Sequence, residues 1–547
     1  MTLITDGEAN IHDVGDSAII LTLGDQVNQE VNERAVGIAA SLRGFDIDGL
    51  RDVVPTFNTV AVFFDPFRTS IELIKEALVK SLGNVASSGP PQLHEIDIVY
   101  GGMDGPDLAR VAHLNGLSEH DVVVRHTART YRVFMLGFMP GFPYLGFIDS
   151  SIVTPRKVSP NIRVPAGSVG IAGNQTGIYP TDSPGGWQII GRTDVQLFNP
   201  KTPPHTTCAP GDLVRFRRVA SLPPKALVSF QHSVSVSTHK RTITILNSGL
   251  WTSVQDLGRW GYQQLGVSVA GPMDISSHRI ANRLVGNSEH AATLEMILVG
   301  AEIRLDTQVT LAVSGADFGA ILDEQPLPLN TPVIGREGAV LKFSGRGSGA
   351  RLYVAFGGGV DTDIVLGSRA THVPSGLGGI NGRIVLPGDR LPLGKLESPE
   401  LQKGKDGFGY QRGGAKLRVI LPSQGRFFDE EAIDILVKTR FTVSQQSDRM
   451  GYRLATTTPI KQTANREIMS GITFMGSIQL PPSGEPILLM ADSQTTGGYP
   501  KIATVITADL SLAGQLAPGD WVEFTACSRR EAVEALVLQE KKILAVC

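Results

Sequence analysis

Short apolar runs separated by turn-forming residues dominate this chain. Residues 59–64 and 95–100 are two such runs, and 61 Gly and 33 Pro are spread among the 547 residues. Short runs bounded by Gly and Pro are typical of β-strands, whereas helices need longer stretches with helical periodicity. The pattern therefore predicts a mainly β protein in which helices are the minority.

The N-terminal part combines strand-like runs with two helical patterns. Residues 28–43 have apolar positions at helical spacing, which predicts the first helix. For the second helix, Thr69 and Glu72 have the spacing of a capping box, and Gly83 marks its end. Residues 1–86 are thus predicted to form a small α+β subdomain with a packing role.

A Pro-Gly-Asp turn that leads into an alternating strand occurs at residues 210–212, 387–389 and 518–520. Each copy ends a domain-sized stretch, so we predict three related β units. Linker-like segments at 217–241 and 397–416 separate these units. The predicted units are the subdomain 1–86, three β units at 87–218, 242–396 and 415–530, and a C-terminal helix at 531–547.

Two stretches rich in hydrogen-bonding groups follow strand-like runs. Residues 492–500 have the sequence Asp-Ser-Gln-Thr-Thr-Gly-Gly-Tyr-Pro, and residues 174–180 have the sequence Asn-Gln-Thr-Gly-Ile-Tyr-Pro. Because Gly lets backbone approach a ligand and Asp, Gln and Thr supply polar groups, the copies predict duplicated loops of a small-molecule site. The alternative is that Gly, Tyr and Pro only form tight corners. The polar density of the second copy favours function.

Other segments have both a structural and a functional interpretation. Phe138, Phe142 and Tyr144 would fill a buried corner or line the apolar side of a pocket, and the first role is the commoner. The glycine-rich runs 354–360 and 376–383 lack the GxxxxGK[ST] signature. Turns between strands are therefore favoured over a phosphate cradle for these runs.

Composition excludes several classes of function. Lys and Arg number 50 against 53 Asp and Glu, a net charge of −3 without a basic stripe, so nucleic acid is not an expected partner. Three scattered cysteines predict neither disulfides nor a zinc cluster and fit a reducing compartment. There is no signal-like N-terminus and no apolar run long enough to span a membrane. We expect a cytoplasmic protein with no membrane partner.

Several catalytic motifs are absent. The chain has no HExxH, GxSxG or Walker A motif, and its 11 histidines lack metal-ligand spacing, so no metal site is expected. The remaining Asp, Gln, Thr, Tyr and Arg groups suit hydrogen bonding to a planar amide-like carbonyl, with Arg or Lys neutralising a carboxylate or phosphate.

Longer motifs resemble a known family over almost the whole chain. The first half contains GFMPGFPYLGF, VPAGSVGIAGNQTGIYP and SPGGWQIIGRT, and it resembles allophanate hydrolase subunit 1, also called kinase-inhibitor-like protein or the B subunit of 5-oxoprolinase. The second half contains SVQDLGRWGYQQLGV, PMDISSHRIANRLVGN, SDRMGYRL and ADSQTTGGYPKIATVITADL, and it resembles allophanate hydrolase subunit 2, or the C subunit of 5-oxoprolinase. The resemblance implies cyclophilin-like β-barrels, one in the first half and two in the second.

The resemblance implies a fused B/C component of ATP-dependent 5-oxoprolinase. Such a component acts with a separate A subunit to open the lactam of 5-oxoproline to glutamate, with ATP and Mg as co-substrate and phosphorylation of the lactam oxygen as the activating step. Both halves also resemble the carboxyltransferase region of urea carboxylase, in the urea amidolyase (allophanate) pathway. That alternative requires a biotin carboxylase and biotin on a separate carrier. A third alternative is a binding module that inhibits a sensor kinase.

Two observations favour the oxoprolinase interpretation. In urea carboxylase the two halves occur in the reverse order, and this chain has no Ala-Met-Lys-Met biotin-acceptor motif. The polar loop at 492–501 argues against a module that only binds a kinase. The true substrate (5-oxoproline, urea or another amide), the nucleotide site and the assembly, a homo-oligomer included, stay open at this stage.

The resemblance also implies site residues at matching positions. Asp492 and glutamine amides would orient the lactam N–H and oxygen, while Arg449, in a charged turn suited to clamping a carboxylate, would offset substrate charge. On this basis, replacing Asp492 with Ala is expected to abolish turnover and leave the melting temperature nearly unchanged. The implied catalytic residues are Asp492, Gln494, Tyr499, Gln175 and Tyr179, and the implied substrate-binding residues are Thr495, Thr496, Arg163, Arg449, Lys501 and Phe142.

Overall fold

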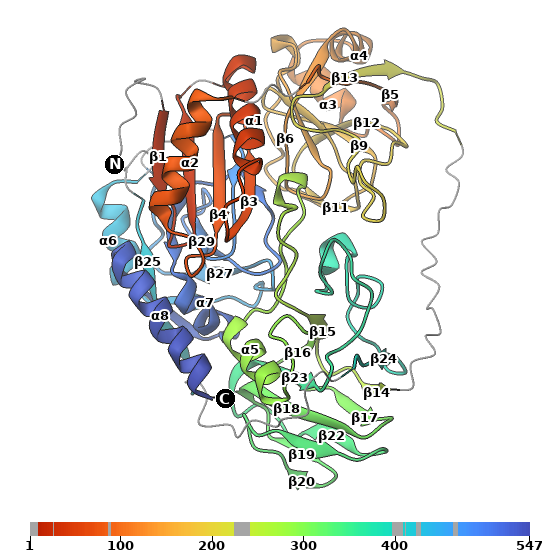
Figure 1. Cartoon of the computed structure of the whole chain (residues 1–547). Helices are drawn as coiled ribbons and strands as arrows, with labels where there is room; N and C mark the ends of the chain where they lie inside the picture. Colours follow the sequence, from red (N-terminus) through yellow and green to blue (C-terminus); the bar gives the residue numbers. More distant parts are fainter. Residues whose placement is uncertain are drawn as a thin grey trace.

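The computed structural model describes residues 9–25, 27–85, 89–223, 241–395, 409–410, 412–422, 428–462 and 469–546. Strands outnumber helices throughout, which confirms the predicted mainly β fold. An N-terminal α+β subdomain lies beside a first barrel and over a second, C-terminal barrel, and a middle unit lies at the far end of the molecule (Figure 1). How the chain divides into independently folding domains stays a prediction.

The N-terminal subdomain is a four-stranded sheet with two helices on one face (Figure 1). The sheet order is β1-β2-β4-β3, formed by β1 (Ala9–Asp13), β2 (Ala18–Leu23), β3 (Leu50–Pro55) and β4 (Thr59–Phe64). The helices are α1 (Gln29–Arg43) and α2 (Ile71–Gly83). Their apolar faces and that of the sheet share one buried core, which is the packing role that the pattern predicts.

The capping box that the sequence predicts for α2 is wrong by one residue. Ser70 precedes the first helical residue, and its side chain accepts a hydrogen bond from the backbone N–H of Leu73. The hydroxyl of Thr69 is buried and has no hydrogen-bond partner among the described residues. The capping hydroxyl must directly precede the helix, and Thr69 lies one position too early.

Two closed seven-stranded barrels share one topology. With strands numbered along the chain within each barrel, both close in the order 1-6-4-5-3-2-7, and the first and last strands pair in parallel. The first barrel contains β5 (Leu93–Tyr100), β6 (Thr130–Leu136), β7 (Pro143–Gly146), β9 (Ser168–Ala172), β10 (Gln175–Ile178), β12 (Gln188–Arg192) and β13 (Leu213–Arg218). The second contains β25 (Gly414–Ile420), β26 (Phe441–Val443), β27 (Gly451–Ala455), β29 (Ser477–Gln479), β30 (Ile487–Leu489), β32 (Lys501–Val505) and β33 (Trp521–Ala526).

Each barrel also carries a two-stranded sheet at an equivalent place. Its strands lie between the third and fourth and between the fifth and sixth strands of the barrel. We call β8 (Asn161–Val164) with β11 (Ser183–Gly185) the first small sheet, and β28 (Gly471–Ile472) with β31 (Thr496–Gly497) the second small sheet. The identical barrel order and identical insertions show that the two barrels are copies of one unit.

The middle unit differs from the closed barrel that the resemblance implies. Its strands form two sheets packed on one core, in the orders β20-β19-β22-β17-β14-β24 and β15-β16-β23-β18-β21. Among the described residues, the short strand β24 pairs only with β14, so no strand joins the edges of the two sheets. The strands are β14 (Thr242–Asn247), β15 (Thr252–Gln255), β16 (Thr293–Ile297), β17 (Glu302–Leu305), β18 (Val309–Asp317), β19 (Ala320–Leu322), β20 (Gln325–Pro326), β21 (Val333–Gly335), β22 (Val340–Phe343), β23 (Ser348–Phe356) and β24 (Arg390–Pro392).

The three Pro-Gly-Asp turns have the same hydrogen bonds, as expected of related units. In each, the glycine has a positive φ, between +92° and +102°, and the Asp side chain accepts from the backbone N–H three residues earlier. The remaining helices connect strands or cover the units: α3 (Leu108–Leu114), α4 (Glu119–Thr127), η1 (Ser150–Ile152), η2 (Gln263–Leu265), α5 (Ile275–Leu284), η3 (Val373–Ser375), α6 (Glu430–Lys438), α7 (Thr507–Gly514) and α8 (Arg529–Val546).

The N-terminal subdomain contacts all three other units. Its carboxylates accept backbone N–H bonds from the middle unit and from the second barrel, and a buried asparagine donates to a carbonyl of the first barrel. These bonds are Gln263 N to Asp52 Oδ2 (2.8 Å), Thr507 N to Asp16 Oδ2 (2.9 Å) and Asn32 Nδ2 to Phe134 O (3.0 Å). The subdomain therefore holds the two barrels and the middle unit in a fixed arrangement.

Candidate functional site

The two barrels meet where the second small sheet approaches the first barrel. The hydroxyl of Tyr144 lies 3.2 Å from Thr496 Oγ1 and also bonds Ser470. The approach requires a glycine, because a Cβ at Gly137 would lie 2.9 Å from Thr496 Cβ, closer than real Cβ contacts. Met469 packs against the aromatic cluster of the first barrel. We call this contact region the junction.

A Gly-Gly-aromatic turn is repeated in the two small sheets. Residues 183–187 (Ser-Pro-Gly-Gly-Trp) and 495–499 (Thr-Thr-Gly-Gly-Tyr) both lie between the fifth and sixth strands of their barrels. The hydroxyls that open the two turns, Ser183 Oγ and Thr495 Oγ1, are both buried and have no hydrogen-bond partner among the described residues. Unpaired buried hydroxyls are costly, so each of these two could exchange a hydrogen bond with a bound molecule. The turn is duplicated, with an equivalent hydroxyl in each copy.

The repeated Gln-Thr motif, at residues 175–180 and 494–500, does not mark equivalent loops. Gln175 opens the fifth strand of the first barrel, where it is buried in the wall and faces Gly146 and Ala172. Gln494 instead follows the fifth strand of the second barrel. The prediction that these two motifs are duplicated loops is therefore wrong. The first copy follows the fourth strand of its barrel, whereas the second copy follows the fifth strand. Aligning the chain on the Gly-Gly-aromatic turns is the signal that finds the equivalence.

Aromatic side chains of the first barrel form a cluster on the side of the junction, separate from the apolar core of that barrel. Phe142 packs edge to face on Tyr179 and Trp187, with ring centroids 5.3 and 5.5 Å apart. Burial raises the pKa of both Tyr144 and Tyr179 above the ordinary value, so these phenols stay protonated. The Tyr179 hydroxyl is bonded by the backbone N–H of Trp187. Phe142 and Tyr179 thus form an apolar wall behind the junction.

Arg449 and Asp492 are ion-paired with each other, at the interface between the middle unit and the second barrel. Arg449 Nε and Nη2 donate to the two oxygens of Asp492 at 2.9 and 2.8 Å, and Nη1 binds Glu295. The side chains of Arg449, Asp492 and Glu295 are 5%, 3% and 0% exposed, respectively. Burial lowers the pKa of Arg449, but the charges of Asp492 and Glu295 outweigh it and hold that pKa above its ordinary value. The carboxylates clamped here belong to the chain itself.

Sequence reasoning misses Glu295, which lies on β16 in the middle unit. Its second oxygen accepts from the hydroxyl of Tyr353 at 2.6 Å and from the backbone of Met273 at 2.9 Å. Both oxygens are therefore satisfied, as a buried carboxylate requires. No local pattern marks this residue, because its partners come from distant strands.

The glycine-rich run 376–383 wraps around a buried arginine. A Cβ at Gly378, whose φ is +69°, would lie 2.7 Å from Arg259 Nη2, which donates to the carbonyl of Ala370. Burial lowers the pKa of Arg259 to about 10. Next to it, His372 Nε2 lies 3.3 Å from the carbonyl oxygen of Asp492. The glycines allow close packing on Arg259, which is the structural interpretation of this run.

The remaining predicted residues of the second barrel lie along its small sheet. The carbonyl of Gln494 accepts from Thr473 Oγ1 at 2.6 Å, and its Nε2 would lie 2.9 Å from a Cβ at Gly497. Tyr499 is 45% exposed. Gln494, Thr495, Thr496 and Tyr499 therefore lie along the second small sheet, and Thr496 among them contacts the first barrel at the junction.

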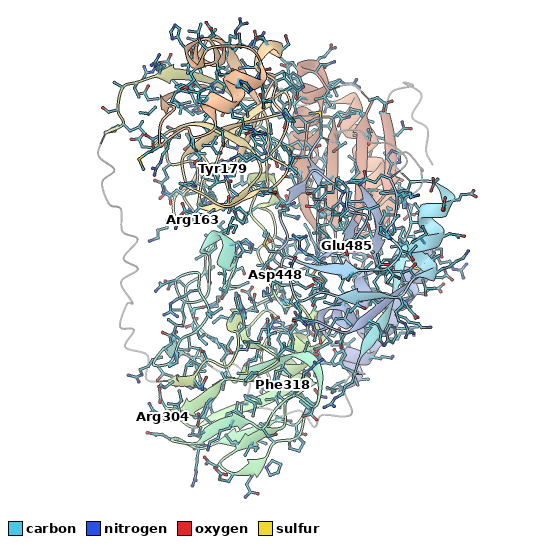
Figure 2. All side chains as sticks on the ribbon, turned by 180° about the vertical axis from the view of Figure 1, so that it is seen from behind. Arg163, Tyr179, Arg304, Phe318, Asp448 and Glu485 are labelled. Atoms are coloured by element: carbon cyan, nitrogen blue, oxygen red, sulfur yellow. The ribbon has the colours of Figure 1, made fainter. Side chains whose placement is uncertain are left out.

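Two predicted cations lie elsewhere. Lys501 Nζ donates to Ile472 O at 2.8 Å and lies 5.7 Å from the ring of Phe474, on the side that faces the N-terminal subdomain. Arg163 is 78% exposed, pairs with Asp182 and projects from the edge of the first barrel (Figure 2). Neither side chain reaches the junction.

We expect Lys501→Met to remove a pH dependence of stability. Burial lowers the pKa of Lys501 from 10.5 to about 8. The unfolded chain therefore binds more protons than the folded chain between these values, so stability rises with pH from about 8 to 10.5. The Met variant should gain stability relative to the wild type at pH 7, and the gain should vanish by about pH 10.5. Thermal unfolding from pH 7 to 10.5 measures this.

The exposed Lys416, whose side chain is 69% exposed in a surface ion pair, provides the matched control. Lys416→Met should leave the pH profile of the unfolding midpoint unchanged. Parallel profiles for wild type and Lys501→Met would contradict a depressed pKa at Lys501.

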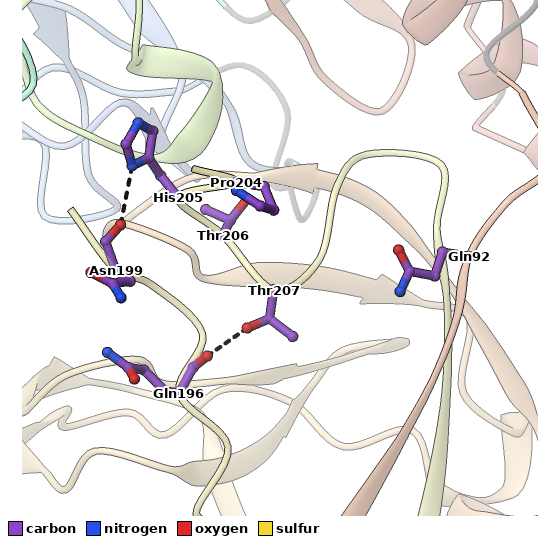
Figure 3. Close-up of a pocket in the computed structure, with 7 residues that line it drawn as sticks. All are labelled: Gln92, Gln196, Asn199, Pro204, His205, Thr206 and Thr207. Atoms are coloured by element: carbon purple, nitrogen blue, oxygen red, sulfur yellow. Dashed lines mark hydrogen bonds between the residues drawn. The ribbon is translucent and has the colours of Figure 1, made fainter. Parts of the chain in front are cut away.

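A separate polar pocket of about 320 Å³ lies on the first barrel (Figure 3). Two of its side chains bond to backbone inside the pocket: His205 Nδ1 to Asn199 O at 3.1 Å and Thr207 Oγ1 to Gln196 O at 2.5 Å. None of the predicted site residues lines it. Within the described ranges, no three His, Cys, Asp or Glu side chains gather as a metal site.

Family models and curated relatives match both halves of the chain. The models are described as "Carboxyltransferase domain, subdomain C and D", at residues 9–208, and "Carboxyltransferase domain, subdomain A and B", at residues 265–526. The C subunit of 5-oxoprolinase from Escherichia coli K12 is 36% identical over 299 residues, which cover 55% of this chain and 96% of the relative. The B subunit of 5-oxoprolinase from Bacillus subtilis is 40% identical over 222 residues, 38% of this chain and 92% of the relative. The chain belongs to the family of the B and C subunits of 5-oxoprolinase.

This member of the 5-oxoprolinase B and C family joins both halves in one polypeptide, as the sequence predicts. The crystal structure of the protein TTHA0988 is similar over 93% of this chain and 99% of its own, with 34% identity and a TM-score of 0.80. Urea amidolyase of Lachancea kluyveri is 30% identical over 324 residues, 55% of this chain but only 18% of that protein. The relationship to both kinds of enzyme component is confirmed.

Proposed function

We propose that this chain is the B/C component of an ATP-dependent 5-oxoprolinase that works with a separate A subunit. The observation that carries the proposal is that relatives named as the B and C subunits of 5-oxoprolinase each match over more than nine-tenths of their length within this one chain. The substrate would be 5-oxoproline, and the product would be glutamate. Both described cysteines are free thiols, which fits the cytoplasmic location that we propose.

The two Gly-Gly-aromatic turns and the loop before the second turn carry groups that suit a lactam. A lactam presents one N–H donor and one carbonyl acceptor on neighbouring atoms of a planar amide. The unpaired hydroxyls of Ser183 and Thr495 and the amide of Gln494 supply matching donors and acceptors. The aromatic wall of Phe142 and Tyr179 would exclude water from one side of the ring, which strengthens the hydrogen bonds to the carbonyl.

Asp492 contributes to this site by holding the neighbouring turn in place. Both of its oxygens are occupied by Arg449, so we assign it the role of holding the turn 493–499 that carries Gln494 and Thr495. ATP, with Mg, would supply the phosphoryl group that makes the lactam carbonyl reactive. We assign this chain the tasks of binding and orienting the lactam.

The direct test is production of glutamate and ADP from 5-oxoproline and ATP. The purified chain should be inactive alone and should turn over when a candidate A subunit is added. Both products should form in equal amounts, measured by coupled assays. If the mixture is inactive with 5-oxoproline, the proposal fails.

A carboxyltransferase is the second candidate, favoured by the printed description of both family models and by the match to urea amidolyase. It predicts carboxylation of urea or a related amide from a carboxylated biotin carrier added in trans. Avidin would block that activity, whereas it should not affect an oxoprolinase.

Among the described helices, none is long and apolar enough to cross a membrane.

A further inference from the structure

The cationic side chains next to the first small sheet differ in whether they have an ion-pair partner. Lys157 Nζ is ion-paired with Asp107 at 2.7 Å, and Arg163 is ion-paired with Asp182. Arg156 lies next to Lys157 and makes no hydrogen bond or ion pair with any described residue. Its guanidinium is therefore available to a ligand.

Arg156 is also placed at the junction. Its guanidinium carbon lies 6.0 Å from the ring centroid of Trp187, in the first Gly-Gly-aromatic turn. Its Nη2 and Nη1 would lie 3.6 and 3.7 Å from a Cβ at Gly498, in the second turn. One side chain thus reaches both copies of the repeated turn. Because Gly498 has no side chain, the donors of Arg156 stay accessible there.

The backbone before Arg156 is fixed by the first barrel. Gln188 Nε2 donates to the carbonyl of Pro155 at 2.9 Å. The other amide atom, Gln188 Oε1, is buried and has no partner among the described residues. Gln188 is 1% exposed and follows the turn that begins at Ser183, so an unpaired acceptor and an unpaired hydroxyl lie in the segment beside Arg156. Together these groups match a ligand with an anionic end and an amide N–H.

The other candidate cations are already occupied. Arg449 is bound by two carboxylates, and Lys501 donates to the carbonyl of Ile472 in β28 of the second small sheet. A planar guanidinium binds a carboxylate through two parallel hydrogen bonds, which adds orientation as well as affinity. We propose that Arg156 binds the carboxylate of the substrate at the junction and so selects carboxylated lactams over plain ones. This inference rests on the proposed oxoprolinase function.

The test compares Arg156→Gln with the wild type in the complete complex with the A subunit. The two substrates are 5-oxoproline and 2-pyrrolidinone, which is the same lactam without a carboxylate. The variant should raise the KM for 5-oxoproline about 10- to 100-fold, as expected for loss of a charge-assisted bidentate bond, with a smaller change in kcat. The preference for 5-oxoproline over 2-pyrrolidinone should fall by the same factor.

Two further variants separate this role from a structural one. Arg156→Lys keeps the charge but not the planar pair of donors, so it should recover part of the affinity. Arg129→Gln removes a half-exposed cation of the same barrel that is paired with Asp149, and it should change KM less than twofold. If the wild-type complex is active and Arg156→Gln behaves like Arg129→Gln, the inference is overturned while the proposed function stands. An inactive wild-type complex overturns both.

Discussion

Replacing Arg449 with Met is expected to destabilise the interface between the middle unit and the second barrel by about 3–5 kcal/mol. Arg449 is the shared partner of Asp492 and Glu295, and all three side chains are nearly inaccessible to water. Met has a similar length but no charge, so two carboxylates would be left buried near each other without a cation. An uncompensated buried charge costs far more than the net worth of the ion pair itself.

The measurement is the midpoint of urea unfolding, followed by far-UV circular dichroism. Arg336→Met is the control, because the Arg336 side chain is 81% exposed and pairs with Asp323 on the surface of the middle unit. That surface pair should contribute less than about 1 kcal/mol. A midpoint for Arg449→Met as high as that of the control would contradict a stabilising role of this buried ion pair. The carboxylate-clamping role assigned by the resemblance would then regain support.

The same contacts change what is expected of Asp492→Ala. The sequence alone suggests loss of turnover with a nearly unchanged melting temperature. In the structure the alanine removes two hydrogen bonds from a buried guanidinium, so a fall in melting temperature should accompany any loss of turnover. Activity alone cannot separate a catalytic Asp492 from a positioning one.

Local signals explain why most elements can be predicted from the sequence. The first helix and the three Pro-Gly-Asp turns each depend on residues within a few positions of one another. The resemblance extends this to the barrels through motifs that cover part of their strands, among them β9 and β10 in the first barrel and β32 in the second. The capping residue of α2 is misplaced by one position because spacing does not say which hydroxyl directly precedes the helix.

Long-range pairing explains what the sequence does not predict. Glu295 meets Arg449 only because two units pack together, and nothing in the residues around Glu295 marks it. Likewise, whether Arg156 is paired or free depends on where Asp107 and Asp182 place their carboxylates. The open middle unit depends on which strands end up at sheet edges, and the alternation of side chains does not encode this.

The repeated Gln-Thr motif shows how similarity between two short sequence motifs can mislead. Its copies share Gln, Thr, Gly, Tyr and Pro, with one inserted residue in the second copy, yet they lie at different strands of the two barrels. The shorter Gly-Gly-aromatic match marks positions that are equivalent in strand order and in their unpaired hydroxyls. Equivalence in a duplicated fold is set by strand order, so the topology is needed to choose between the two alignments.

Replacing Gly137 with Ala is expected to separate the two barrels at the junction and to lower turnover by about 100-fold or more. The new Cβ would overlap the side chain of Thr496, whose own Cβ would be 2.9 Å away. Because Thr496 is fully buried and bonded to Tyr144, it cannot rotate away without losing that bond. The second small sheet must shift, and displacement of a site by about 1 Å is enough for such a loss.

Stability should change less than activity in this variant. Overpacking one methyl costs about 1–3 kcal/mol, so the chain should remain folded at 25 °C. Gly83→Ala, at the end of α2, is the matched control, because nothing lies within 4 Å of its Cβ position. Turnover by the complex with the A subunit and the thermal unfolding midpoint should both be unaffected there.

A double variant tests the cause directly. Thr496→Gly removes every Thr496 atom that a Cβ at Gly137 would strike, so it should restore the unfolding midpoint of Gly137→Ala even though it destabilises the wild type by removing the bond to Tyr144. Thr496→Gly would thus lower the unfolding midpoint of the wild type but raise that of Gly137→Ala. Such a change of sign indicates that the two residues are in direct contact. If the two changes instead add, or if Gly137→Ala keeps wild-type turnover, the barrels do not depend on this contact and the junction is not where the substrate is held.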